Sequence, residues 1–229
     1  MFLIVARVAG LPLMAGPARD VRATLSPPLQ RICLGPWRRL VGAPICTPTS
    51  QARSVVLSVS LYEISIPTYR RGLENLASFL DKAEAHARVN GVELSTYTEA
   101  RLAPDMHPFT RQVQFASDAA KGGAARLAGI EAPPMPDTET TFAQLKARIT
   151  KTIAFLDTIT PEQVNNRHGA TIELPLPGRT MNFTAPDFLM QFSLANFLFH
   201  VTTAYALLRS HGVPLGKMDF LAGGQNMAA

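Results

Sequence analysis

The chain has 229 residues, of which 47% are hydrophobic, and its 22 lysines and arginines outnumber its 17 aspartates and glutamates. The excess positive charge lies in residues 1–56, which hold seven arginines and a single acid, Asp20. The rest of the chain is nearly neutral, which argues against a nucleic-acid-binding surface there. Outside the polar-containing last helix, no apolar run reaches the roughly 18 residues of a membrane span. We therefore expect no membrane segment.

Residues 1–56 have no sustained helical or alternating hydrophobic pattern and contain both cysteines and seven of the 18 prolines. This composition predicts a disordered extension. It fits a secretory signal, an organelle presequence or a start codon assigned too far upstream. We favour the last, because sequence of globular character begins abruptly near Val56 and prolines interrupt the helix that a presequence needs. The part that follows has no cysteine, which is consistent with a cytoplasmic protein.

The periodicity of residues 65–90 predicts the first helix. Apolar residues recur there every three or four positions, and Pro67 suits a first helical turn. A second helix is predicted to begin at Asp105, whose carboxylate can cap it, and to end at Gly129.

A proline-rich spacer, residues 131–140, separates the second helix from a third. The pattern predicts that Asp137 or Thr138 caps this third helix. We expect it to stop before Thr160, since proline follows.

The period then changes, because residues 171–183 alternate between apolar and polar side chains around Pro177-Gly178. This pattern is typical of a short β-hairpin. A fourth and nearly all-apolar helix is predicted from Pro186 to Gly212. The predicted fold is therefore all-α: a four-helix bundle over residues 57–224 with a hairpin before the last helix, and a flexible tail at residues 225–229.

Helical spacing also predicts which side chains form the core. On the last helix we expect the inward residues to be Phe192, Ala195, Phe199, Thr202 and Leu208. Their expected partners are Leu73, Leu80, Val113, Phe142 and Ile149.

Two segments carry a resemblance to a known family. The sequence reads LAPDM at residues 102–106 and FHVTTAY at residues 199–205. With the flanking helices, these segments resemble an uncharacterised family of bacterial and fungal proteins that have the DinB-like bundle fold. The similarity extends over about residues 57–223, and the hairpin before the last helix belongs to the same pattern.

The wider DinB-like superfamily implies a divalent metal. Many of its members hold the metal with one histidine on the second helix and two more, spaced H-x-x-x-H, on the last, and some transfer small thiols. Here His200 is present, but Ala204 and Asn196 stand four residues after and before it. Asp105 and His107 could complete a set with His200 for zinc, nickel or iron.

Each of these residues also has a structural interpretation. His200 could be a core residue that donates to a hydroxyl or a carbonyl, with Thr202, Thr203 and Tyr205 as candidate partners. Asp105 could be only a helix cap, and the neighbouring His107 could be a partly exposed residue of the first turn.

Two function hypotheses follow. In the first, the protein is a metal- or histidine-assisted enzyme that acts on a small molecule, with His200 as ligand or base, Tyr205 as proton donor, and Asp105 and His107 assisting. In the second, it is a non-catalytic, homodimeric binding or structural bundle that has lost the superfamily metal site. Nucleotide cofactors are disfavoured because the chain has no GxGxxG or P-loop pattern.

Overall fold

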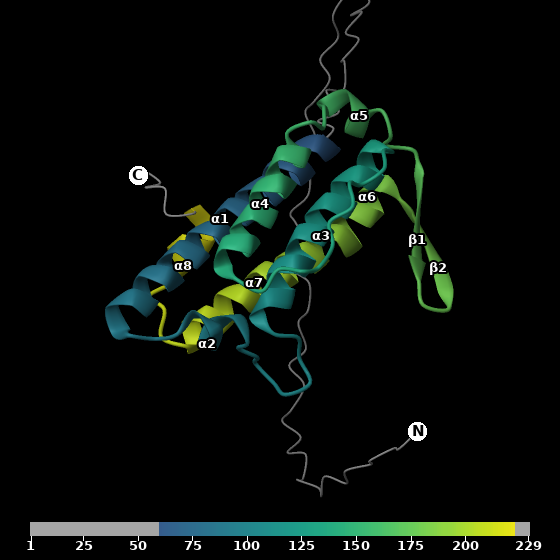
Figure 1. Cartoon of the computed structure of the whole chain (residues 1–229). Coiled ribbons are helices and arrows are strands. Elements are labelled where there is room, and N and C mark those ends of the chain that lie inside the picture. The colour runs from purple at the N-terminus through teal and green to yellow at the C-terminus, as the bar shows by residue number, and fades with distance from the viewer. Residues whose placement is uncertain (1–59, 223–229) are drawn as a thin grey trace, which may run out of the picture. The chain divides into compact units, whose positions relative to one another are not determined.

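Four long helices lie lengthwise against one another in the computed structural model, which describes residues 60–222 (Figure 1). They are α1 (Leu61–Asn90), α3 (Phe109–Ala128), α4 (Phe142–Leu156) and α7 (Leu194–Ser210). The most extensive contacts follow the cyclic order α1, α4, α3, α7, and α1 also contacts α3 across the bundle. The predicted all-α four-helix bundle is confirmed. The predictions for residues 1–56 and 225–229 lie outside the described residues.

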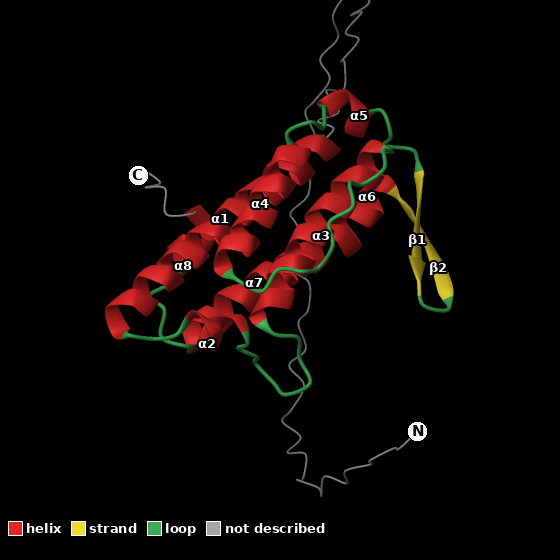
Figure 2. Ribbon diagram, viewed as in Figure 1, coloured by secondary structure: helices red, strands yellow, loops and turns green. Residues whose placement is uncertain are grey.

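Shorter elements connect and cover the bundle. They are α2 (Leu94–Thr98), α5 (Pro161–Asn165), β1 (Thr171–Leu176), β2 (Arg179–Thr184), α6 (Ala185–Asp187), the π-helix η1 (Phe188–Ser193) and α8 (Lys217–Ala222). The two strands form the predicted antiparallel hairpin beside the helices (Figure 2), with Ile172 opposite Phe183. Pro177 and Gly178 make its turn, in which Gly178 has a φ of +78° that favours glycine. Within residues 60–222, no helix combines the length and the apolar character that crossing a membrane requires.

The core between the four helices is formed largely by the residues that helical spacing predicts. The expected partners Leu73, Leu80, Val113, Phe142 and Ile149 are all buried. Because these side chains come from α1, α3 and α4, the inward faces of the first three helices are confirmed.

Two of these helices begin at other residues than predicted. The helix α1 starts at Leu61, because the side chain of Ser60 accepts a hydrogen bond from the backbone and caps it, so that Pro67 lies inside the helix. The helix α3 starts only after Pro108, and Asp105 is an exposed residue of the preceding turn. A residue before proline avoids the α conformation, which keeps the helix from extending back through His107. The prediction that Asp105 caps α3 is therefore wrong.

The start of α4 also corrects a prediction. Neither Asp137 nor Thr138 caps this helix. Thr141 does so, in a capping box in which its side chain bonds the amide of Gln144 while the Gln144 side chain bonds the amide of Thr141. The sequence signature of this box, threonine followed three residues later by glutamine, is present in the chain.

The last helix has a different inward face from the one predicted. Phe199 is 56% exposed, whereas Phe197 and Val201 are fully buried. The cause is η1, whose wider π-helical turn places one more residue in the turn than an α-helix does. In an uninterrupted α-helix the inward positions would be residues 188, 192, 195 and 199. With the π-helical turn they are residues 188, 193, 197 and 201. Of the five predicted inward residues, Leu208 is buried and Phe192 is half-buried, whereas Ala195, Phe199 and Thr202 are exposed.

Candidate functional site

A cavity of about 190 Å³ lies between α3 and the η1–α7 segment. Its polar lining consists of Asp118, Arg126, Ser193, Asn196 and His200. Aromatic rings close the remaining wall, and two of them come from η1. A π-helical turn is found often at functional sites because it redirects side chains that an α-helix would point elsewhere. The cavity therefore combines a polar cluster with a local distortion of the last helix.

His200 is held in one orientation by a glutamine on the facing helix. Its Nδ1 lies 2.9 Å from Oε1 of Gln112, and Nε2 of the same glutamine donates to the carbonyl oxygen of His107 at 3.0 Å. Gln112 is almost fully buried, so its side chain has little freedom. The backbone thus fixes the glutamine, and the glutamine fixes the histidine.

This chain of hydrogen bonds decides the tautomer of His200. A carbonyl oxygen only accepts, so the amide nitrogen of Gln112 must face His107 and its oxygen must face the imidazole. The Nδ1 atom of His200 then carries the proton and donates it to the glutamine. Its Nε2 atom makes no hydrogen bond to a described residue, and it is not among the buried atoms that lack a partner. The lone pair on Nε2 is therefore left for a ligand or solvent.

The surroundings of His200 favour its neutral form. Burial lowers the pKa of His200, and the nearby His107 lowers it further. The ring of Phe115 contacts both imidazoles, with centroids 5.1 Å from that of His107 and 5.0 Å from that of His200. At neutral pH the imidazole of His200 is thus a hydrogen-bond and proton acceptor rather than a cation.

A second polar group, the hydroxyl of Ser193 in η1, also lines the cavity. The Ser193 hydroxyl lies 2.6 Å from the hydroxyl of Tyr69, which is completely buried between the helices. Burial raises the pKa of Tyr69 far above its usual value, so it stays protonated. A Cβ atom at Gly123 would lie only 2.3 Å from the serine oxygen, so this position needs glycine. Ser193 is therefore held in place by the tyrosine on one side and the backbone of α3 on another.

Asp118 enters the cavity wall as part of a charged network. Its carboxylate accepts from the guanidinium of Arg148 at 2.8 Å and from Lys121 at 3.0 Å. Arg148 is 1% exposed and also pairs with Asp137 and Glu139. Burial alone would raise the pKa of Glu139, but hydrogen bonds from its own backbone, from Gln114 and from Arg148 lower it overall. The network joins α3, α4 and the loop between them.

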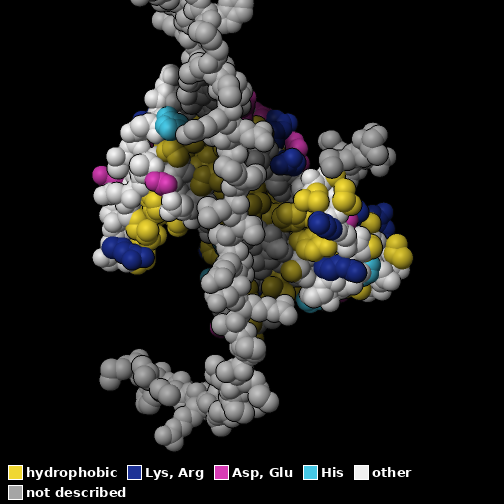
Figure 3. All heavy atoms as spheres, turned by 180° about the vertical axis from the view of Figure 1, so that it is seen from behind, with side chains coloured by type: hydrophobic (Ala, Val, Ile, Leu, Met, Phe, Trp, Pro, Cys, Tyr) yellow, Lys and Arg dark blue, Asp and Glu magenta, His cyan; other side chains and the backbone are white. Residues whose placement is uncertain are grey.

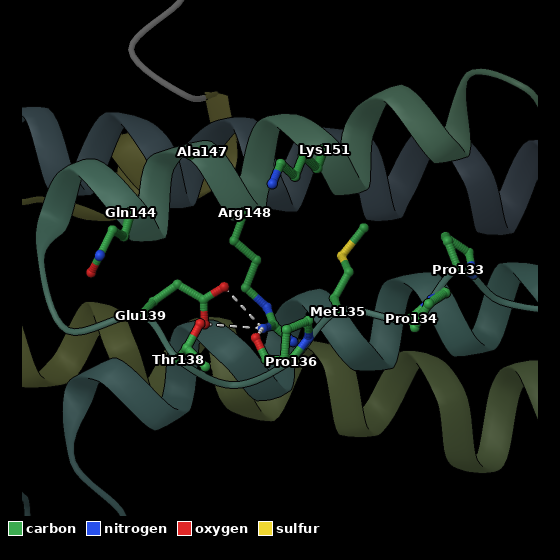
Figure 4. Close-up of a pocket in the computed structure, with 10 residues that line it drawn as sticks. All are labelled: Pro133, Pro134, Met135, Pro136, Thr138, Glu139, Gln144, Ala147, Arg148 and Lys151. Atoms are coloured by element: carbon green, nitrogen blue, oxygen red, sulfur yellow. Dashed lines mark hydrogen bonds and ion pairs between the residues drawn. The ribbon is translucent and has the colours of Figure 1, made fainter.

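This network also underlies a larger groove of about 500 Å³ along α4 (Figure 4). The proline-rich loop forms one side, and Glu139 points from it toward Arg148. The carboxylate and the guanidinium bond each other, so the polar groups at the floor serve to hold the loop on the helices. We assign the groove a structural role and regard the smaller cavity as the candidate site.

The predicted metal ligands are not gathered there. Asp105 and His107 are both exposed in the turn before α3, and only His200 lines the cavity. Within residues 60–222, no three histidine, cysteine, aspartate or glutamate side chains form a group that could hold a metal ion. The geometry therefore gives no support to a metal held by Asp105, His107 and His200.

Tyr205, the predicted proton donor, faces a different part of the molecule. Its ring packs edge-on against Phe79 at 5.7 Å and against Phe220 at 6.2 Å, which places it toward α1 and α8. Thr203 bonds the carbonyl of Phe199. None of the hydroxyl groups predicted as partners of His200 forms a hydrogen bond with it. The side-chain amide of Gln112 is the partner of its Nδ1 atom instead.

Comparison with known proteins agrees with this fold. Residues 61–221 match the family described as a domain of unknown function, DUF1993. The chain belongs to this family. Among solved structures, it is similar to the crystal structure of a DinB family member from Shewanella denitrificans, with 36% sequence identity and a TM-score of 0.66. The similarity covers 74% of this chain and 96% of that one, and confirms the predicted DinB-like fold. No curated protein sequence matches the chain.

The metal implied by the wider superfamily can be tested on the residues of this DUF1993 protein. The helix α7 offers one histidine toward the cavity, and the position one turn later is the fully buried Ala204. Asp118, the acid that lines the cavity, already pairs with two cations, Lys121 and Arg148. The residues present do not fit a three-ligand metal centre.

Several residues of the site in this DUF1993 protein are not among the predicted site residues. Asp118, Arg126 and Ser193 line the cavity, and Gln112 orients His200. The sequence holds a signal for the α3 residues. Gln112, Phe115, Asp118, Ala119 and Arg126 lie at helical spacing, and so share a second face of the helix beside the apolar stripe. Ser193 has no such signal, because its position depends on the π-helical turn.

Proposed function

We propose that this DUF1993 protein binds a small polar molecule in the cavity between α3 and η1–α7, and that Nε2 of His200 accepts a hydrogen bond or a proton from it. The observation that supports this most directly is the hydrogen bond from His200 Nδ1 to Gln112. A second group that orients a histidine is the usual arrangement of a general base. A cytoplasmic location agrees with this proposal and stays a prediction.

The expected ligand is small. The cavity of about 190 Å³ is below the roughly 300–1,000 Å³ of sites for drug-sized ligands. The amide of Asn196 and the hydroxyl of Ser193 lie one and two helical turns before His200, so they can bond polar atoms of the same molecule. The arrangement is suited to binding and to proton transfer.

The proposal predicts the protonation of His200. Nitrogen NMR of the full chain should show a proton on Nδ1 and none on Nε2 at neutral pH, with a pKa below the ordinary 6.5. Since the unfolded state then binds the proton first, the stabilisation from neutral His200 is present above pH 6.5 and is lost as the pH falls through the lower, folded-state pKa. Replacing the partner, Gln112→Ala, should release the tautomer preference.

The matched control is Gln191→Ala, which removes an exposed glutamine bonded to Asp187 on the same side of the molecule. It should leave the His200 signals unchanged. A wild-type spectrum with the proton on Nε2, or a pKa above 6.5, would contradict the proposed role.

A second candidate, a homodimeric bundle, has an observation of its own. Hydrophobic side chains gather in patches on the face shown in Figure 3. On the outer side of η1 and α7, Met190 is 57% exposed and Leu198 and Phe199 are 40% and 56% exposed. We propose that this surface, Met190, Leu198 and Phe199, pairs two copies of the chain, since apolar patches on a soluble protein commonly mark interfaces.

Light scattering tests the dimer. The wild-type chain should elute with twice the monomer mass, and Phe199→Glu should shift it to the monomer, because a charge cannot be buried unpaired in the interface. Val89→Glu adds the same charge at an exposed apolar residue of α1 and serves as the control. A wild-type monomer at all concentrations would exclude the dimer.

A further inference from the structure

Arg126 stands apart from the other charged residues around the cavity. Its NH1 donates to the carbonyl oxygen of Gly122 at 3.0 Å, one turn earlier on α3. No ion pair within residues 60–222 includes Arg126. A half-buried guanidinium that pairs with no carboxylate of residues 60–222 is unusual, since charged groups are normally paired where water is partly excluded.

The neighbouring charges balance without it. The network around Arg148 joins the cations Arg111, Lys121 and Arg148 to the carboxylates Asp118, Asp137 and Glu139. Three positive charges therefore meet three negative ones. Because the carboxylate of Asp118 is bound by two cations on the α4 side, it does not neutralise the guanidinium of Arg126. The cavity thus carries one uncompensated positive charge.

The helix makes room for this guanidinium. A Cβ atom at Gly122 would lie 2.8 Å from NH1 of Arg126, so the guanidinium would have to shift from its place against the backbone. Glycine is less favourable than alanine inside a helix. A buried glycine in the middle of α3 therefore fits a position that has to hold the guanidinium against the helix.

From these observations we infer that the cavity takes a small organic anion, whose carboxylate pairs with Arg126 while its other end meets His200. This inference rests on the proposed function and names the class of its ligand. A guanidinium binds a carboxylate with charge-assisted hydrogen bonds, which are about twice as strong as neutral ones. The rings of Phe115, Phe188 and Phe192 offer an apolar wall between the two polar ends. A flat, small monocarboxylate matches this lining.

The 4-hydroxy derivatives of benzoate and benzamide test the charge requirement, because they have nearly the same shape and differ in charge at neutral pH. Each also carries a phenol O–H that can donate to Nε2 of His200, and the two probes are abbreviated to benzoate and benzamide. In an NMR titration of the full chain, benzoate should bind at least about tenfold more tightly than benzamide. Arg126→Gln should remove this preference. The control Arg70→Gln changes the net charge equally at an exposed arginine paired with Glu74 and Asp157, and should keep it.

Gly122→Ala gives a second, independent variant. It retains every charge and improves the helix propensity, but it displaces the guanidinium of Arg126. Benzoate binding should weaken, but by less than in Arg126→Gln, because the shifted guanidinium keeps its charge. Benzamide binding should not change.

The outcomes separate the two proposals. Equal binding of benzoate and benzamide with a shifted His200 signal would overturn the anion inference and leave the proposed function standing. Full benzoate affinity in Arg126→Gln would also overturn the inference. If neither probe perturbs His200 in the wild-type chain, both the anion inference and the proposed function fail.

Discussion

Replacing Phe197 by alanine is expected to lower the free energy of unfolding by about 3–5 kcal/mol, as for other buried aromatic residues. The ring is fully buried and meets Tyr69 edge-on, with centroids 5.2 Å apart. It also fills the space over Gly72, where a Cβ atom would come within 2.5 Å of it. Urea unfolding followed by circular dichroism would measure the loss.

The control is two residues away. Phe199→Ala removes the same ring from a position that is 56% exposed, and is expected to change the free energy of unfolding by no more than about 0.5 kcal/mol in the monomer. Similar losses at Phe197 and Phe199 would show that the last helix has the phase of an uninterrupted α-helix and that η1 does not form.

Replacing Arg148 by alanine is expected to cost about 3 kcal/mol. The guanidinium is 1% exposed and bonds Asp118, Asp137 and Glu139. Its removal leaves Glu139 without a cation, and leaves Asp118 and Asp137 with only Lys121 and Arg111. The loop between α3 and α4 should also loosen, because Arg148 donates to the carbonyl of Pro136 at 3.3 Å. Thermal unfolding and hydrogen exchange of this loop measure both effects.

Arg70→Ala is the matched control. Arg70 also pairs with two carboxylates, those of Glu74 and Asp157, but its side chain is 46% exposed. Exposed ion pairs contribute at most about 1 kcal/mol, so this variant should stay close to wild type. If Arg148→Ala were as stable as Arg70→Ala, the network would not hold the loop on the bundle.

The molecule has two polar clusters, the network around Arg148 and the cavity with Arg126 and His200. They differ in whether their charges are paired within the protein. Around Arg148 the charges balance within the protein, so the cluster needs no further charge, although the buried Nε atom of Arg148 has no hydrogen-bond partner among the described residues. At the cavity neither the guanidinium of Arg126 nor the Nε2 atom of His200 is matched within residues 60–222: the first has no ion pair and the second no hydrogen bond there. Groups left open in this way distinguish a candidate binding site from a structural contact.

The sequence by itself determined the bundle. Apolar residues at helical spacing predict the inward faces of α1, α3 and α4, and the alternation around Pro177-Gly178 predicts the hairpin. These features depend on local periodicity and turn chemistry, which are properties of neighbouring residues. The start of α4 could also have been predicted correctly from the sequence, because Thr141 and Gln144 carry the signature of a capping box.

Only the tertiary structure decided the site. The π-helical turn that moves Phe199 outward and Ser193 inward forms where the last helix packs on Tyr69 and on the backbone at Gly123. The partner of His200 is Gln112, 88 residues earlier in the chain. Hydrogen bonds between distant segments depend on how helices are offset and rotated against one another, and helical spacing within one segment does not contain that information.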